Sequence, residues 1–346
     1  MEIYRLADKE NGPKAEKIKN DNIINFILEN WNLTDVAFPG PQPVSLERKD
    51  LEQIKTKDYL VCVKSDGMRF LMIIYDGIAY MMDRSVKCFK INLNFKVIKF
   101  GIFDGELVYT KDLKWQYIIH DCINYDKVNV SENILTDRLK YVNLLLDDFI
   151  IDTSDFEITN KQFCGTKEIQ TLLNSNINHA IDGLIFTPIY KRVGKFTQYD
   201  LLKWKERHTF DLKIHVNDKK ISAYINQNTY EKLYGDVPID SFAGKLFMKK
   251  LEELPTFKND CIVECEYYEK YENDTHVYIP IKIRHDKIYP NSYTTVQKTI
   301  LNVKENIMIN ADRNYMIQLL DNLVINTISY CKEGRISISL NQDRNH

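Results

Sequence analysis

The residue best suited to covalent chemistry in this chain is Lys64, which ends an apolar run. The run Tyr-Leu-Val-Cys-Val at residues 59–63 favours a buried strand, whereas an ammonium group avoids burial. An amine held out of water and near other cations gives up its proton more readily, and the neutral amine is a nucleophile. The sequence therefore indicates covalent catalysis at Lys64.

Three Asp-Gly pairs place carboxylates at the borders of predicted strands. They lie in Lys-Ser-Asp-Gly-Met-Arg at residues 64–69, Phe-Asp-Gly-Glu-Leu at 103–107 and Ile-Asp-Gly-Leu-Ile-Phe-Thr-Pro at 181–188. If the three pairs converge on one cleft, their carboxylates could hold Mg²⁺, a cation that prefers oxygen ligands. Each segment alone is also compatible with an ordinary turn, because Asp-Gly is a common turn pair, and a turn is the better interpretation of 103–107 taken alone.

Two further segments supply cations suited to phosphate groups. Lys203 and Lys205, in Leu-Leu-Lys-Trp-Lys, are two residues apart and point to the same face of a strand. Arg284 and Lys287, in Arg-His-Asp-Lys-Ile-Tyr-Pro-Asn at 284–291, suit a polyphosphate, since an arginine can bind two oxygens at once. Taken alone, the lysine pair is compatible with an exposed strand, and the second segment is better explained as a charged loop.

The hydrophobic pattern predicts the elements that must position these residues. It predicts helices over 14–31, 132–150 and 166–175, strands across 59–122 with a hairpin at Asp76-Gly77, and a strand at 184–188. From 210 to 290, short β-type runs alternate with charged turns, which predicts a small barrel. Helical spacing returns over 294–329.

Composition and charge bound the class of protein. With 44% hydrophobic and 28% charged residues, the chain is typical of a globular protein, and no stretch resembles a membrane span or a secretory signal. The net charge of −2 argues against coating nucleic acid by charge alone, so such contact is expected to be local, as for a chain end held in a cleft. The seven cysteines are odd in number and scattered, which favours reduced thiols over a zinc site.

In their order and spacing, the five segments together resemble the guanylyltransferases of mRNA capping. These enzymes belong to the covalent lysyl-nucleotidyltransferase superfamily, which also holds ATP-dependent DNA and RNA ligases. The resemblance runs from Phe38 to about Asn291. Three segments are closer to capping enzymes than to ligases: Phe-Pro-Gly-Pro-Gln-Pro-Val-Ser at 38–45, Leu-Lys-Trp-Lys at 202–205 and Arg-x-Asp-Lys-x-x-Pro-Asn at 284–291.

The resemblance implies an α+β fold with two domains. A nucleotidyltransferase domain of antiparallel sheets flanked by helices is expected over residues 1–208, and a C-terminal OB-fold β-barrel over 209–304. A helical tail over 305–346 is expected to pack back on the first domain, with partner binding as the rival role. The OB-fold would close over the nucleotide for the first chemical step and open afterwards.

The resemblance also implies a reaction and its cofactors. Lys64 would attack the α-phosphorus of GTP, with Mg²⁺ or Mn²⁺ as metal, and expel pyrophosphate. The lysyl-GMP intermediate would then pass GMP to the 5′-diphosphate end of RNA, which completes mRNA 5′ capping. RNA triphosphatase and cap methyltransferase activities are expected on separate chains, and the phosphorylated tail of RNA polymerase II is a further candidate partner. The expected location is the nucleus for a cellular protein and the cytoplasm for a viral one.

Site roles carry over from the family position by position. The implied roles are ribose contact for Arg69 and Glu106, metal binding for Asp182, α-phosphate contact for Lys203 and Lys205, contact with the β- and γ-phosphates for Arg284 and Lys287, and guanine O6 contact for Lys161. The chain departs from the family at His120, where a phenylalanine usually stacks on the base. Imidazole offers less stacking area and can change its charge near neutral pH.

Two other functions remain open from the sequence. An ATP-dependent polynucleotide ligase shares the lysine chemistry, but it must clasp a nicked duplex, which usually demands more positive charge than a net −2. A non-catalytic binding relative would have no physical need to keep this many acidic and cationic groups together. Preference for ATP over GTP in a labelling assay would favour the ligase, and a folded protein that neither binds GTP nor forms a covalent adduct would favour the binding relative.

Overall fold

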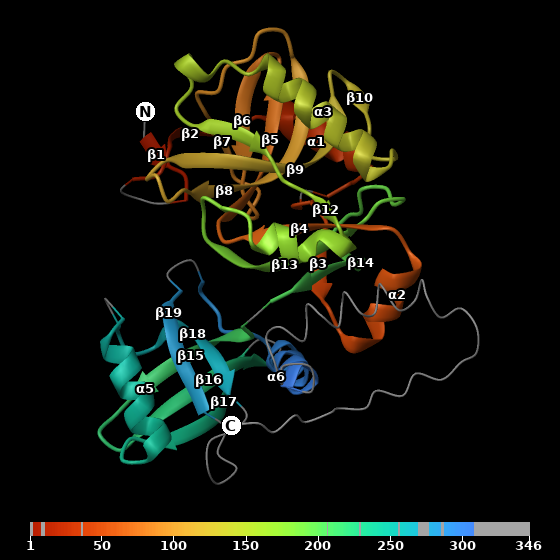
Figure 1. The fold of residues 1–346 in the computed structure, drawn as a ribbon. Coiled ribbons are helices and arrows are strands. Elements are labelled where there is room, and N and C mark those ends of the chain that lie inside the picture. The colour runs from red at the N-terminus through yellow and green to blue at the C-terminus, as the bar shows by residue number, and fades with distance from the viewer. Residues whose placement is uncertain are drawn as a thin grey trace, which may run out of the picture.

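The computed structural model describes residues 3–7, 11–35, 37–205, 207–227, 230–254, 257–268, 277–284 and 287–307. Figure 1 shows two lobes, an N-terminal lobe that contains two sheets and a C-terminal lobe that contains the third. Mixed helices and mainly antiparallel sheets make up the protein, in agreement with the α+β class expected from the sequence. No helix in the described part of the chain is both long and apolar enough to cross a bilayer.

The larger sheet of the N-terminal lobe has nine strands. They are, in spatial order, β1 (Ile3–Arg5), β2 (Lys14–Ile18), β7 (Cys88–Lys90), β6 (Ile78–Met82), β5 (Met68–Tyr75), β8 (Phe100–Tyr109), β9 (Trp115–Tyr125) and β10 (Val128–Asn129), with β11 (Glu157–Asn160) beside β9. The predicted hairpin joins β5 and β6, and Asp76 and Gly77 have φ values of 50° and 74°. Such left-handed residues suit a tight turn between twisted antiparallel strands.

The predicted helix over 14–31 is correct only in its second half. Residues Lys14–Ile18 form β2, which pairs with β1 and β7, and α1 spans Asp21–Trp31. Asn20 caps the helix, because its side chain accepts a hydrogen bond from the backbone of Asn22. The apolar positions of 14–18 can serve either element, and pairing with a distant strand decides for the sheet.

The smaller sheet of the N-terminal lobe lies under the larger one in Figure 1; Lys64 and Lys203 lie on its strands, and Lys205 directly follows one of them. Its five strands, in spatial order, are β12 (Cys164–Gly165), β4 (Tyr59–Ser65), β13 (Ile181–Pro188), β14 (Thr197–Trp204) and β3 (Gln42–Ser45). All neighbours are antiparallel except β14 and β3. Its buried face packs on α2 (Leu51–Thr56) and α4 (Ile169–Leu173), through a core that includes Val61, Phe186 and Leu202.

The helices predicted over 132–150 and 166–175 are both present, the first on the larger sheet and the second on the smaller one. The predicted helix over 132–150 is α3 (Leu135–Asp148), which lies against β9 and β11. The prediction over 166–175 corresponds to η3 (Thr166–Glu168) followed by α4. Two further short 3₁₀ helices are η1 (Arg48–Asp50) and η2 (Ile151–Thr153).

The C-terminal lobe is a five-stranded antiparallel sheet with two helices. Its elements are β17 (Tyr230–Pro238), β16 (Lys220–Gln227), β15 (Thr209–Val216), β18 (Cys261–Tyr268), β19 (Val277–Ile283), α5 (Phe242–Glu252) and α6 (Tyr293–Ile307). In the described residues β17 and β19 are the two edges of this sheet, so a closed OB-fold barrel stays a prediction.

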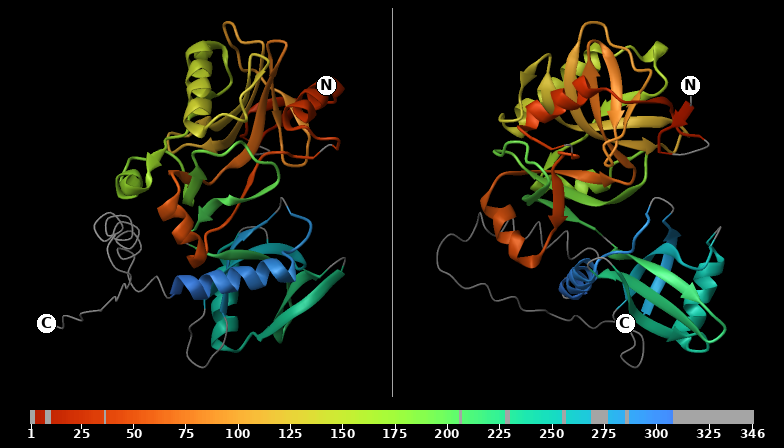
Figure 2. Two further views of the ribbon diagram at one scale, coloured as in Figure 1. Left: turned by 90° about the vertical axis from the view of Figure 1, so that its right-hand side faces the viewer. Right: turned by 180° about the vertical axis from the view of Figure 1, so that it is seen from behind.

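The predicted C-terminal helical segment begins with α6. Figure 2 shows this helix lying across the C-terminal lobe, where Val296 and Val303 join the core beneath β15. Residues 308–346 lie outside the described part of the chain, so the packing of the expected tail on the N-terminal lobe stays a prediction.

Candidate active site

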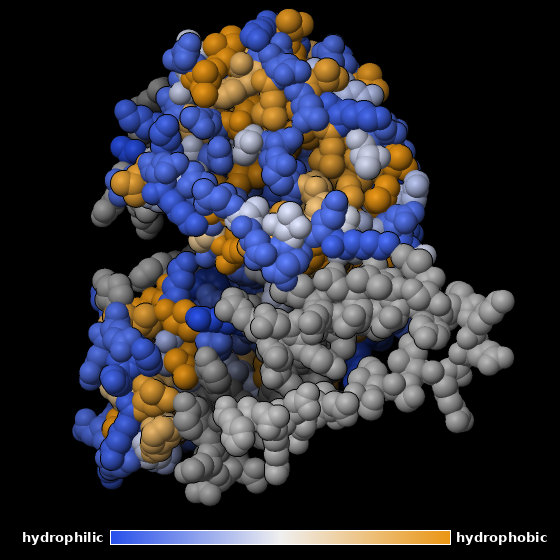
Figure 3. All heavy atoms as spheres, in the orientation of Figure 1, coloured by the Kyte–Doolittle hydropathy of each residue, from blue (hydrophilic) through white to orange (hydrophobic). Residues whose placement is uncertain are grey.

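One cavity of about 780 Å³ opens between the two sheets of the N-terminal lobe and extends to the C-terminal lobe. Figure 3 shows hydrophilic residues along the visible hollow between the lobes. The cavity is lined by every residue singled out from the sequence: Lys64, Arg69, Glu106, His120, Lys161, Asp182, Lys203, Lys205, Arg284 and Lys287. Segments more than 200 residues apart in sequence therefore share one space.

Asp182 is the carboxylate around which the lysines gather. Its Oδ2 accepts from Lys64 Nζ at 3.0 Å and lies 2.7 Å from Lys205 Nζ. A register shift in β13 between Ile181 and Leu184 brings Asp182 to this position. The shift depends on Gly183, whose φ is +126° and whose added Cβ would lie 2.0 Å from a backbone oxygen of β14.

The second oxygen of Asp182 has features of a metal ligand. Asp182 Oδ1 is buried and has no hydrogen-bond partner among the residues that the structure describes, and such an atom is costly unless a ligand satisfies it. In the described ranges no group of three or more His, Cys, Asp or Glu side chains could hold a metal ion without other ligands. This arrangement fits Mg²⁺, which is usually held by one or two carboxylates together with waters and substrate phosphates.

Lys203 lies on the floor of the cavity, which is the side formed by the smaller sheet. Burial, together with the neighbouring cations Lys205 and Lys64, lowers the pKa of Lys203 from its usual value to about 8. Lys203 pairs in register with Ile185 of β13, and this places it on the same floor as Lys64 and Asp182. An incoming anion such as phosphate would relieve the repulsion among these ammonium groups.

The opposite wall of the cavity is organised by Asp104, which is completely buried. Arg69 binds it with two nitrogens, Nε at 2.9 Å and Nη2 at 2.5 Å, and His120 Nε2 lies 3.4 Å away. Burial alone would raise the pKa of Asp104, but Arg69 and His120 hold it well below its usual range. Asp104 therefore stays ionised and anchors both side chains at the wall.

The turn predicted over 103–107 is wrong. Asp104 and Gly105 lie inside the continuous strand β8, where Asp104 is paired with Leu71. A Cβ on Gly105 would lie 2.6 Å from both the Ile118 carbonyl oxygen and the Tyr117 ring. The glycine is therefore needed for close strand packing and not for a turn.

Two further predicted residues complete this wall. Burial raises the pKa of Glu106, although His120, Lys64 and other nearby cations act in the opposite direction. Lys161, which is 8% exposed, donates a hydrogen bond from its ammonium group to the hydroxyl of Ser65. The wall thus offers a carboxyl group and an ammonium group, one acceptor and one donor, to a bound molecule.

The two cations of the C-terminal lobe share a buried anchor. Arg284 Nη1 lies 3.1 Å from Asp211 Oδ1, and Lys287 Nζ lies 2.7 Å from Asp211 Oδ2. Asp211 is 4% exposed and lies on β15, so the core of the lobe fixes its position. Both cations line the cavity opposite the lysine floor, with a geometry suited to a phosphate chain.

Comparison with known proteins shows the family of this chain. The family model for the catalytic domain of the mRNA capping enzyme matches residues 10–207, which is more than half of the chain. The chain belongs to the mRNA capping enzyme family. The match covers the floor and wall of the cavity, including Lys64, Asp182 and both Lys203 and Lys205.

Relatives in this family are eukaryotic capping enzymes. The mRNA-capping enzyme of Caenorhabditis elegans is 28% identical over 327 residues, covering 82% of this chain and 49% of the relative. That of Danio rerio is 28% identical over 289 residues, covering 75% and 46%. The mRNA-capping enzyme subunit alpha of Schizosaccharomyces pombe is 26% identical over 329 residues, covering 78% of each chain. The chain thus spans about half the length of the animal relatives it matches.

Sequence reasoning missed Arg84, which also lines this cavity. Arg84 lines the cavity from the β6–β7 turn and donates to Gln42 Oε1 at 3.0 Å. Burial and the charge of Arg69 lower its pKa. The only local signal is a cation directly after an apolar hairpin strand, and that pattern is common on protein surfaces.

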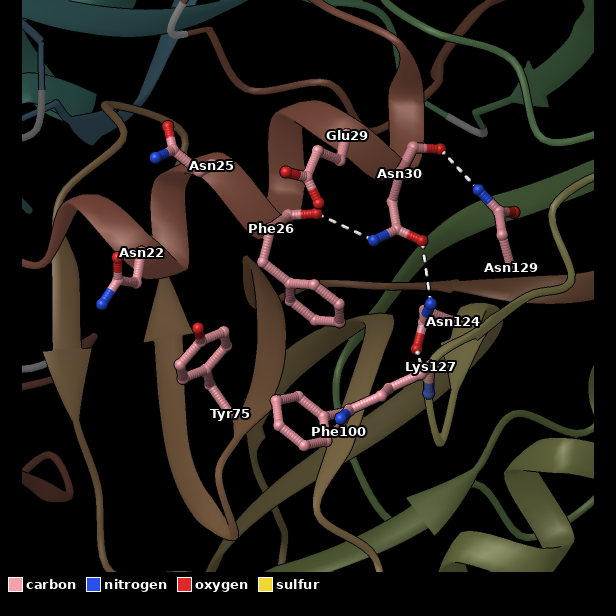
Figure 4. A pocket seen from close by; sticks show the side chains of 10 residues that line it. All are labelled: Asn22, Asn25, Phe26, Glu29, Asn30, Tyr75, Phe100, Asn124, Lys127 and Asn129. Atoms are coloured by element: carbon pink, nitrogen blue, oxygen red, sulfur yellow. Dashed lines mark hydrogen bonds between the residues drawn. The ribbon is translucent and has the colours of Figure 1, made fainter.

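A second cavity, of about 620 Å³, lies next to α1 on the same face of the larger sheet, at the ends of β5 and β8 away from Arg69 and Glu106. Figure 4 shows the aromatic rings of Phe26, Tyr75 and Phe100 at its base, with Lys127 over the ring of Phe100 at 4.2 Å. None of the predicted site residues lines it. Among the described residues that line it, Lys127 alone is a cation, so it offers no gathering of cations for a polyphosphate.

Proposed function

We propose that this protein is a GTP:RNA guanylyltransferase that caps mRNA through a covalent lysyl-GMP intermediate. The observation that carries the proposal is the position of Lys64 Nζ, 3.0 Å from Asp182 in a cavity that Lys203 and Lys205 also line. Membership of the capping enzyme family makes guanylyl transfer the expected use of such a nucleophile.

In the first step, the neutral amine of Lys64 attacks the α-phosphorus of GTP. A P–N bond forms, the bond from that phosphorus to the bridging oxygen breaks, and pyrophosphate leaves with the electron pair. The nitrogen of the neutral amine loses one proton as the phosphoramidate forms, and Asp182 Oδ2 is within hydrogen-bond distance to accept it. Lys203 and Lys205 would hold the α-phosphate while charge builds on its oxygens.

Pyrophosphate must leave in line with the attacking nitrogen. Arg284 and Lys287 would bind the β- and γ-phosphates from the C-terminal lobe, where Asp211 holds both in place. Because these cations come from the other lobe, closure would favour the first step and opening would release pyrophosphate.

The metal would be Mg²⁺ or Mn²⁺, held by Asp182 Oδ1 together with phosphate oxygens. Asp182 Oδ1 fits this role because it is buried and has no hydrogen-bond partner among the described residues. When bound, the metal would neutralise charge on the phosphates and orient them.

The opposite wall would bind the nucleoside. Arg69 and Glu106 would contact the ribose, Lys161 would donate to guanine O6, and His120 would lie against the base. His120 has 28% of its side chain exposed and is tied to Asp104, so its ring has a defined position. Phe163 also lines the cavity and is available as a second surface for the base.

In the second step, an oxygen of the 5′-diphosphate end of RNA attacks the lysyl-GMP phosphorus. A P–O bond forms, the P–N bond breaks, and Lys64 Nζ takes up a proton. A separate RNA triphosphatase would supply the diphosphate end, and a cap methyltransferase would act on the product. The phosphorylated tail of RNA polymerase II is a further proposed partner, and the nucleus is the proposed location.

The test is a labelling experiment with each of the four ribonucleoside triphosphates, labelled at the α-phosphate, in the presence of Mg²⁺. We expect acid-labile, alkali-stable label on the protein from GTP, and none in Lys64→Ala. Lys57→Ala, which changes an exposed lysine just before β4, is the matched control and should label normally. Label from ATP in preference to GTP, or label that persists in Lys64→Ala, would contradict the proposal.

A further inference from the structure

A chain of three polar side chains runs from the cavity wall into the protein behind it. Lys161 donates to Ser65 Oγ, and Ser65 Oγ lies 2.6 Å from His179 Nε2. Lys161 and Ser65 line the cavity and are 8% and 5% exposed, whereas His179 does not line it. These two hydrogen bonds therefore connect Lys161, which lines the cavity, to His179, which does not.

The segment that carries His179 is held firmly. His179 forms an isolated antiparallel bridge with Thr110, and Asn178 Nδ2 donates to Asp112 Oδ2 at 2.6 Å. On its other side, the backbone N–H of Asp66 donates to the Ala180 carbonyl at 2.9 Å. The imidazole is thus fixed relative to the strand end that bears Ser65.

The hydrogens available on each group decide which one donates in these two hydrogen bonds. An ammonium group has no acceptor, so Ser65 must accept from Lys161. Burial, with the nearby cations Lys161 and Lys111, lowers the pKa of His179 to about 4, so the imidazole is neutral near pH 7. A lone pair on Nε2 facing the cation is favoured electrostatically, and it can accept the one hydroxyl hydrogen of Ser65.

We propose that His179 is a positioning residue for nucleobase selection, acting through Ser65 on Lys161. This inference rests on the proposed guanylyltransferase function and extends it to a residue outside the cavity. By accepting the Ser65 hydrogen, His179 keeps the Ser65 lone pair turned to Lys161 and fixes the ammonium group. Two N–H donors of Lys161 then remain for the substrate.

This arrangement selects a base that presents an acceptor. A purine whose carbonyl oxygen faces Lys161 accepts a hydrogen bond from the ammonium group. A purine with an amino group in that place offers only N–H donors, and the ammonium group cannot accept from them. Leaving a buried charged donor unpaired carries a large penalty, so the wrong base is rejected. Without His179, Ser65 is free to rotate, and the position of Lys161 is less sharply defined.

The experiment compares label transfer from GTP with that from the triphosphate of diaminopurine riboside, which carries an amino group where guanine has O6. In His179→Ala we expect the ratio of the two kcat/KM values to fall roughly ten-fold, mainly through a higher KM for GTP. His179→Gln, whose amide oxygen can accept from Ser65, should restore much of the ratio. His215→Ala, which removes a half-exposed histidine of the C-terminal lobe, is the control and should leave it unchanged.

A merely structural role would lower labelling from both nucleotides alike and leave the ratio intact, which would overturn the proposal. In the wild-type protein, nitrogen NMR of His179 should show Nε2 without a proton. A protonated Nε2 would also overturn it, whether or not the variants fold. If wild-type protein forms no adduct with GTP, the guanylyltransferase proposal fails instead, and the two failures are distinguishable.

Discussion

Lys64 Nζ and Asp182 Oδ2 are 3.0 Å apart, although 118 positions separate the two residues in the chain. The contact is made by β4 and β13, which are neighbours in the smaller sheet, and by the register shift beside Gly183. It places the proposed nucleophile next to a carboxylate whose other oxygen has no partner in the described part of the chain.

Asp182→Asn is expected to slow lysyl-GMP formation by about 100-fold, a typical effect of removing one preorganised charge interaction from an active site. The amide keeps the shape but loses the charge that pairs with Lys64 and Lys205. Rapid quenching of the labelling reaction measures the rate. Asp218→Asn, at an exposed turn, is the control, and equal rates in the two variants would contradict a role for Asp182.

Binding of GTP is expected to weaken as the pH rises above about 8, because Lys203 then loses its charge. Its lowered pKa means that the ammonium form dominates below this pH and disappears above it, with at most about a ten-fold loss of binding per pH unit. The α,β-methylene analogue of GTP, which cannot lose pyrophosphate, isolates binding from chemistry.

Calorimetry between about pH 7 and pH 9.5 should show the loss in wild-type protein. Lys203→Arg keeps its charge over that range, so its binding should be nearly independent of pH. The same slope in both proteins would assign the titration to another group.

Asp211→Asn is expected to slow the first step more than the second. The variant removes the charge of the anchor that Arg284 and Lys287 share, while Arg284 keeps Glu264 at 3.5 Å, so the leaving pyrophosphate is held less precisely. We expect lysyl-GMP formation to fall roughly ten-fold, while transfer from preformed lysyl-GMP to diphosphate RNA changes little. Asp260→Asn, an exposed carboxylate of the same lobe, is the control. An equal loss in both steps would show that Asp211 acts on folding alone.

Arg138→Ala is expected to lower the free energy of unfolding by about 3–5 kcal/mol, because it leaves Asp121 as an unpaired charge in the interior. Arg138 is 2% exposed, binds both oxygens of Asp121, and donates to the Lys191 carbonyl at 2.9 Å. Urea unfolding measures the change. Arg192→Ala, whose side chain is 71% exposed, should cost less than about 1 kcal/mol. Similar values for both would contradict the buried-pair interpretation.

Local chemistry made part of the fold predictable. The hairpin at Asp76-Gly77 follows from residues that tolerate a positive φ between two apolar strands, and α3 follows from helical spacing. Segment 14–31 was only half predictable, because the strand at its beginning exists through pairing with β7. Pairing of this kind depends on a distant segment, which local periodicity does not contain.

By itself, the sequence determined which side chains could act: a nucleophilic lysine, further cations for phosphates and the carboxylates of Asp-Gly pairs, all in the order found in capping enzymes. The tertiary structure decided how these groups meet. It buried Asp104 inside β8 through the close packing of Gly105, and it placed two cations beside Asp211. It also placed Arg84 in the cavity and His179 beside Ser65. Charge, burial and hydrogen-bond direction arise from neighbours in space, and most of these neighbours lie far away along the chain.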